Sequence, residues 1–124
     1  MEKIPDPTTA DSLTQLNRRL KAFAQVRNWE QFHSPKNLAM ALIAECAELV
    51  EHFQWLSEAQ SAQLPLEKLQ EVETELADIL VYLIRMADKL GVDLIAAAER
   101  KIEINEKKYP ADKVRGSSRK YTEY

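Results

Sequence analysis

The sequence predicts an all-α protein, because turn residues are scarce, strand-forming residues are sparse and the central apolar residues recur at helical spacing. Two glycines and five prolines in 124 residues leave little of the turn chemistry that a β-sheet needs. The chain has no internal repeat and is long enough for one core. We therefore expect a single helical domain over residues 1–124, with flexible tails at 1–10 and 112–124.

Four helices are expected from the apolar periodicity and its boundary residues. Ser34 followed by Pro35 suits the start of a helix, since the hydroxyl can cap it and proline is favoured at the first helical position. Gly91 can adopt the left-handed conformation that ends a helix, and Pro110 disfavours helix in the residue before it. The expected helices cover about 11–27 (capped by Thr9, Asp11 or Ser12), 34–57, 66–90 and 93–109, with a loop at 57–65. Four helices in about 100 residues indicate a bundle.

The second and third expected helices are apolar around most of their circumference, over residues 38–50 and 76–87. Helices of this kind need cover on all sides, and so short a chain has too few helices to provide it. We expect these two helices to pack against a second subunit as well. The alternative is an unusually well-covered monomer.

Composition argues against several classes of protein. A net charge of −3 without a basic stripe before the last dozen residues makes a nucleic-acid polymer an unlikely partner. One cysteine, Cys46, and two histidines, His33 and His52, cannot complete a structural zinc site of the usual four N/S ligands. The chain shows neither a charged-then-apolar leader nor an apolar run of about 18 residues, so we expect a cytoplasmic protein without a membrane span.

Four acidic residues interrupt the two apolar stretches. Glu45 and Glu48 lie three residues apart on the second expected helix, and Glu75 and Asp78 repeat this spacing on the third. Side chains three apart share a helix face, where like charges repel. Such a pair usually marks a solvated surface, but burial of an unpaired carboxylate costs several kcal/mol. We expect neither apolar stretch to contain a lysine or arginine that could pair with these acids. A bound cation must then compensate their negative charge.

A hard divalent cation fits four carboxylates best. Carboxylate oxygens suit Mg²⁺, with Mn²⁺ as a possible substitute, whereas zinc and copper call for Cys or His. A di-iron bundle would use Glu-x-x-His pairs, and neither Glu45 nor Glu75 has histidine three residues later. Mg²⁺ held by a few carboxylates keeps water ligands and takes phosphate oxygens, which indicates phosphate chemistry.

The acidic pattern is part of a wider resemblance. Glu45-x-x-Glu48, 26 intervening residues and Glu75-x-x-Asp78 resemble the metal-binding motif of the MazG-like, all-α nucleotide pyrophosphohydrolases. Within that superfamily, further segments resemble the dCTP pyrophosphatase branch, over about residues 12–122. These segments are Arg-Asn-Trp-Glu-Gln-Phe-His at 27–33, Pro-Lys-Asn-Leu at 35–38, Phe-Gln-Trp at 53–55, Lys-Ile-Glu-Ile-Asn at 101–105 and Ser-Ser-Arg-Lys-Tyr-Thr at 117–122.

The resemblance implies a fold, an activity and an assembly. It implies a four-helix MazG-like bundle that works as a homotetramer, a dimer of dimers. It also implies cleavage of a nucleoside triphosphate between the α- and β-phosphates, in nucleotide-pool housecleaning. Glu45, Glu48, Glu75 and Asp78 would then be the magnesium ligands, with Glu48, or else Glu45, orienting the attacking water.

Substrate contacts are implied in the same way. Trp29 and Trp55 match tryptophans placed around the nucleobase, where an aromatic face can stack on a base, although core packing is an alternative. The other matching positions are Tyr82, Lys101, Asn105 and Tyr109. A looser hypothesis gives phosphate contacts to Lys36, Lys108, Arg115, Arg119 and Lys120.

Base preference is less firmly indicated than the chemistry. Some relatives have a histidine on the first helix near the base pocket, where this chain has Leu20 or Lys21. The substrate could be dCTP, a modified dCTP or a broad set of nucleoside triphosphates. A different alternative is a helical regulatory module that binds nucleotide without cleaving it, although all four acids are present.

Overall fold

The computed structural model describes residues 11–118, which form helices and connecting turns without any strand in that range. The chain falls into two compact units that divide after Gly91. In chain order the elements are α1 (Ser12–Val26), η2 (Glu30–Phe32), α2 (Pro35–Phe53), α3 (Glu58–Ser61), α4 (Leu66–Leu90), α5 (Leu94–Lys108) and α6 (Ala111–Val114).

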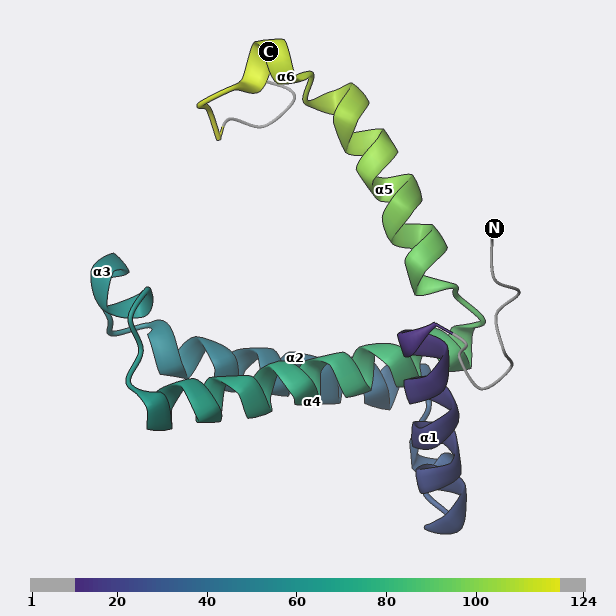
Figure 1. The fold of residues 1–124 in the computed structure, drawn as a ribbon. Coiled ribbons are helices and arrows are strands. Elements are labelled where there is room, and N and C mark those ends of the chain that lie inside the picture. The colour runs from purple at the N-terminus through teal and green to yellow at the C-terminus, as the bar shows by residue number, and fades with distance from the viewer. Residues whose placement is uncertain (1–10, 119–124) are drawn as a thin grey trace, which may run out of the picture. The chain divides into compact units, whose positions relative to one another are not determined.

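The first unit is built on the long contact between α2 and α4 (Figure 1). These two helices lie side by side, with α3 in the connection between them, and α1 packs against α4 as well. The buried apolar core is small and comes from all three helices, through Ala24, Leu38, Val72, Ile84 and Ala87. Its position fixes the faces of α2 and α4 that meet.

The expected helix boundaries are largely confirmed. Ser34 caps α2, since its hydroxyl accepts a hydrogen bond from the Asn37 N–H at 3.1 Å. Of the candidate caps for α1, the structure uses Asp11, whose carboxylate accepts from the Thr14 N–H. Gly91 ends α4 with a φ of 68°, a left-handed conformation that glycine adopts without steric cost.

The segment between α2 and α4 differs from the expected loop. The second helix ends at Phe53 rather than near Ser57, and a short helix, α3, follows. Ser57 and Gln60 form a reciprocal capping box at its start. This spacing of serine and glutamine is a known helix-start pattern, so the sequence contained the signal for α3.

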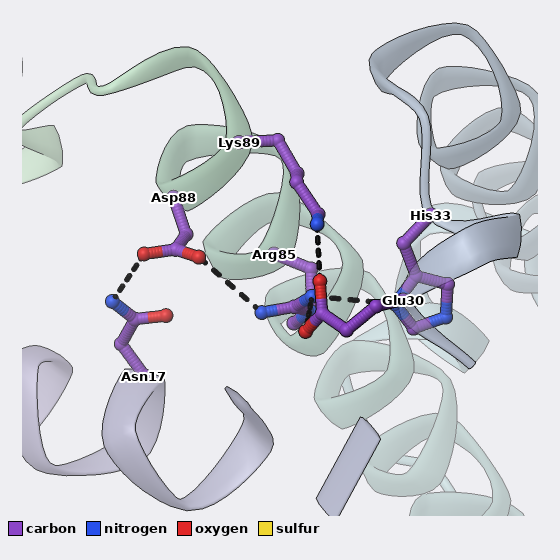
Figure 2. A network of polar contacts seen from close by, with 6 residues as sticks. All are labelled: Asn17, Glu30, His33, Arg85, Asp88 and Lys89. Carbon is purple, nitrogen blue, oxygen red and sulfur yellow. Dashed lines mark hydrogen bonds and ion pairs between the residues drawn. The ribbon is translucent and has the colours of Figure 1, made fainter. Parts of the chain in front are cut away.

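A polar cluster ties α1, η2 and α4 together (Figure 2). Arg85 of α4 is only 2% exposed, and its guanidinium pairs with Glu30 at 2.9 Å and with Asp88 at 3.4 Å. Asp88 in turn accepts a hydrogen bond from the Asn17 amide of α1, and Lys89 pairs with Glu30. The expectation that neither apolar stretch contains a lysine or arginine is wrong, because Arg85 lies inside the second one.

The second unit contains α5 and α6. Asp93 caps α5 through the Ala96 N–H, and the helix ends at Lys108, just before Pro110 as expected. Of the tails expected to be flexible, residues 1–10 and 119–124 lie outside the described residues, whereas 112–114 belong to α6. The single-domain organisation stays a prediction.

Large apolar side chains remain exposed on both central helices. Ile43 of α2 is 65% exposed and Leu76 of α4 is 53% exposed. Other exposed side chains of this kind are Met40, Val50, Leu66, Leu69, Leu80, Leu83 and Leu90. Within residues 11–118, no helix combines the length and the apolar character that a membrane span requires.

The cap of α2 yields a stability prediction. Ser34→Ala should lower the free energy of unfolding by about 1 kcal/mol, because the N-terminal N–H groups of α2 lose an acceptor. Ser34→Asp should retain stability, and Ser12→Ala, at the first position of α1 rather than at its cap, should change little. Urea denaturation at one fixed protein concentration measures all three. Equal midpoints for wild type and Ser34→Ala would contradict this role of the cap.

Candidate metal centre

Three of the four expected acids converge where α2 meets α4. Glu45 and Glu48 project from α2 and Glu75 from α4, and each supplies a carboxylate oxygen within 4.8 Å of the other two. Glu45 and Glu75 are half-buried, whereas Glu48 is exposed. The i, i+3 spacing on α2 and the side-by-side packing of the helices therefore produce a compact group of oxygen ligands.

Two oxygens in this group have no hydrogen-bonding partner. Oε2 of Glu45 and Oε2 of Glu75 are both buried and accept no hydrogen bond from residues 11–118. No lysine or arginine of the described chain pairs with Glu45, Glu48 or Glu75. Buried polar atoms are normally satisfied, so these oxygens fit a site for a hard cation, which carboxylates coordinate.

The pKa values of the two half-buried acids reflect this crowding. The hydrogen bond that a proton on Glu45 can make to Glu75, followed by desolvation and the closeness of Glu48, raises the pKa of Glu45 to about 7. The same contact with Glu45 acts to lower the pKa of Glu75, but desolvation and repulsion by Glu48 and Asp78 outweigh it and leave that pKa raised. A proton held by this pair of carboxylates would compensate part of their negative charge when no cation is bound.

Asp78 lies beside this group rather than in it. It is half-buried, one turn after Glu75 on α4. Its charge contributes to the raised pKa values of Glu45 and Glu75, but its oxygens are outside the set of three that converge. The expected role of Asp78 as a fourth ligand stays a prediction.

The same face of α4 continues beyond the acids. Glu75, Asp78, Tyr82, Arg85 and Lys89 follow one another at intervals of three or four residues, so they form one stripe along the helix. Tyr82, an expected substrate contact, is half-buried in this stripe between Asp78 and Arg85. Arg85 is not among the residues expected from the sequence, although an arginine within an apolar stretch and three residues before an aspartate is a signal of a buried ion pair.

The two expected base-contacting tryptophans lie in different settings. Trp29 precedes η2, is 44% exposed and makes an edge-to-face contact with Phe23 at 5.6 Å between ring centroids. The Arg27 guanidinium stacks on the ring of Phe23, 3.5 Å from its centroid. Trp55 follows α2 and is 86% exposed. Neither indole belongs to the buried core of the described residues.

The remaining expected contacts belong to the second unit. Lys101 is exposed and Asn105 half-buried, at i, i+4 spacing on α5. Tyr109 follows the helix, and its N–H donates to the Asn105 carbonyl at 2.8 Å. Of the looser phosphate candidates, Lys36, Lys108 and Arg115 are described, whereas Arg119 and Lys120 lie outside the described residues.

The chain is similar to known proteins of one family. The model of the MazG-like family matches residues 41–124. The chain is 45% identical to dCTP pyrophosphatase 1 of Homo sapiens, over 96% of this chain and 69% of the human protein. It is 44% identical to dCTP pyrophosphatase 1 of Rattus norvegicus, with the same coverage.

A solved structure supports the same conclusion. A pyrophosphatase from Archaeoglobus fulgidus superposes with a TM-score of 0.78 at 38% identity, covering 87% of this chain and 99% of the archaeal one. The family model and the curated relatives each extend over most of the present sequence. The chain therefore belongs to the MazG-like family, on the branch of the dCTP pyrophosphatases.

Proposed function

We propose that this protein is a divalent-cation-dependent dCTP pyrophosphohydrolase that produces dCMP and pyrophosphate in nucleotide-pool housecleaning. The observation that carries the proposal is the convergence of Glu45, Glu48 and Glu75, two of them with unpartnered buried oxygens. The substrate follows from the curated relatives, which are dCTP pyrophosphatases. A modified dCTP or a wider set of triphosphates is the alternative substrate range.

The proposed ligands are Glu45, Glu48, Glu75 and Asp78, and the proposed cation is Mg²⁺, with Mn²⁺ as a substitute. A cation in this position supplies neutralisation of charge on the phosphate oxygens and activation of water. The three converging carboxylates support a hard cation, since they offer oxygen ligands alone. Asp78 is added because it lies on the same face of α4 and its charge acts on the other acids.

We assign orientation of the attacking water to Glu48. Its carboxylate is exposed, so water reaches it, whereas Glu45 is more enclosed and is the second choice. The water oxygen forms a bond to the α-phosphorus as the bond from that phosphorus to the bridging oxygen breaks, and pyrophosphate leaves. The carboxylate accepts the proton that the water releases.

Substrate recognition is proposed for aromatic and polar residues other than the four acids. Trp29 and Trp55 present accessible indoles, which can each stack on a base for about 1–3 kcal/mol. Tyr82 adjoins the acids on α4 and is proposed to contact the sugar or a phosphate. Lys101, Asn105 and Tyr109 of the second unit are proposed to bind the triphosphate, for which a lysine ammonium is a suitable point charge.

The proposed assembly is a homotetramer, a dimer of dimers. The exposed apolar side chains of α2 and α4, such as Ile43 and Leu76, support it, because exposed apolar patches on a protein surface often mark an interaction site. The cytoplasmic location expected from the sequence stays a prediction.

The product and the metal requirement test the activity. With Mg²⁺, the protein should release pyrophosphate and not orthophosphate from dCTP, and EDTA should abolish release. Glu75→Gln should lower kcat at least about 100-fold, because a cation ligand is lost. Glu71→Gln, on an exposed side chain one turn earlier in α4, is the matched control and should retain activity. Orthophosphate as the first product would exclude the proposed reaction, and nucleotide binding without any product would favour the regulatory module.

The raised pKa of Glu45 predicts how pH affects the metal-free protein. The pKa of Glu45 is about 7 in the folded protein, against an ordinary value of 4.5. Protonation of Glu45 therefore favours the folded state at low pH, and this stabilisation is lost as the pH rises through 7. Urea midpoints in EDTA should therefore fall between pH 6 and 8, and Mg²⁺ should restore the midpoint at pH 8.

Glu45→Gln is the internal control for this pH effect, since its amide does not titrate. His33, whose pKa is lowered by desolvation and then by Arg85, changes stability in the opposite sense in both proteins and cancels in the comparison. The variant should show a flatter pH dependence in EDTA and a higher midpoint than wild type at pH 8. Identical pH profiles would contradict the placement of the shared proton on Glu45.

The exposed apolar faces predict an interface. Ile43→Asp should dissociate the assembly, because a charge would have to be buried at the contact. Sedimentation velocity should show a tetramer for the wild type and smaller species for the variant. Glu51→Asp, a change between two acids at an exposed position of α2, should not alter the assembly. A monomeric wild type at micromolar concentration would overturn the proposed tetramer.

A further inference from the structure

The link between α1 and α2 is a short, well-defined segment that carries Trp29. The Trp29 N–H donates to the Ala24 carbonyl at 2.9 Å, and the preceding Asn28 has a φ of 56°, which is uncommon for a residue other than glycine. These local features fix the path of the backbone at the end of α1. They do not by themselves determine where the indole lies relative to α4.

The residue after Trp29 makes the connection to α4. Glu30 accepts from the Arg85 guanidinium through Oε1 at 2.9 Å and pairs with Lys89 through Oε2. His33, at the other end of η2, is 3.4 Å from the same guanidinium through Nδ1 (Figure 2). Both ends of η2 therefore contact one buried side chain of α4.

The burial of Arg85 makes this connection specific. A buried guanidinium without a partner carries a large desolvation cost, so removal of one partner is strongly unfavourable. The hydrogen bond from Lys89, together with the charge of Arg85, keeps the pKa of Glu30 below its usual value. Glu30 is thus ionised throughout the neutral range, and the pair does not switch on and off with pH there.

Arg85 and Asp78 lie on the same face of α4, seven residues apart. At 1.5 Å per residue, the helix separates them by roughly 10 Å. The α4 helix therefore carries the acids at one point and, two turns further on, Arg85, which pairs with Glu30 next to Trp29.

We propose that the Glu30–Arg85 ion pair is a positioning device that places Trp29 relative to the acidic centre and so sets affinity for the base. The inference rests on the proposed function, in which Trp29 contacts the base. Glu30 and Arg85 act through the indole and do not touch the substrate.

Glu30→Gln is the test, since it keeps the shape of the side chain and removes its charge. If the Trp29 indole is displaced, it binds the base more weakly. KM for dCTP should therefore rise about tenfold, while kcat at saturation stays within about twofold. In a Trp29→Ala background the same substitution should change KM by less than twofold, because the indole through which it acts is absent. Glu71→Gln, which breaks the exposed pair with Lys68 on the same helix, is the matched control and should leave KM unchanged.

A merely structural role gives a different pattern. If Glu30→Gln lowers kcat and kcat/KM together, or raises KM by the same factor in the Trp29→Ala background, the positioning role is overturned. A wild type that does not cleave dCTP would refute the proposed function instead. The placement of Trp29 is then read without substrate, from the ¹⁹F NMR signal of fluorotryptophan-labelled protein assigned with Trp55→Phe. A shift of the Trp29 signal in Glu30→Gln but not in Glu71→Gln supports the inference, and an unchanged signal overturns it.

Discussion

Carboxylates crowded between two packed helices impose the main constraint on this molecule. Glu45 and Glu75 face each other across the contact of α2 and α4, with Glu48 close enough to repel both. Unscreened charge repulsion would push the helices apart, and a proton on this group would relieve part of it when no cation is bound. In the proposed function the same oxygens bind a hard cation, which links stability and metal binding through one group of atoms.

The α4 helix places the acids and the Arg85 cluster at a fixed separation from each other. Its 25 residues run unbroken from Leu66 to Leu90, and a helix of that length is a rigid spacer. The acids occupy one part of a single stripe, and Arg85 occupies another. The two parts of the stripe differ in charge compensation. Within residues 11–118 the acids have no lysine or arginine partner, whereas Arg85 has two carboxylate partners. In the proposed function, the chemistry and the placement of the base therefore depend on different parts of one helix.

Much of this arrangement was predictable from the sequence, and the exceptions have physical reasons. The four acids stood out because charged residues are rarely surrounded by apolar ones, and the capping residues Ser34 and Gly91 marked helix ends by their conformational preferences. The ion pair of Arg85 with Glu30 joins residues 55 positions apart, and helical spacing carries no information about such a pairing. The separation of Asp78 from the converging oxygens also depends on how two helices rotate against each other, which spacing on one helix does not determine.

The exposure of the aromatic side chains bears on how a base is held. Stacking on an indole is most effective when the base is shielded from water, but Trp55 is 86% exposed and Trp29 keeps nearly half of its surface accessible. The apolar side chains around α2 and α4 are also uncovered, including Ile43 and Leu76. Assembly of several copies would bury the apolar faces and reduce access of water to the helices that carry the acids. A single copy of the chain leaves both tryptophans accessible. If they bind the base as proposed, its recognition depends on what covers the indoles as well as on the indoles themselves.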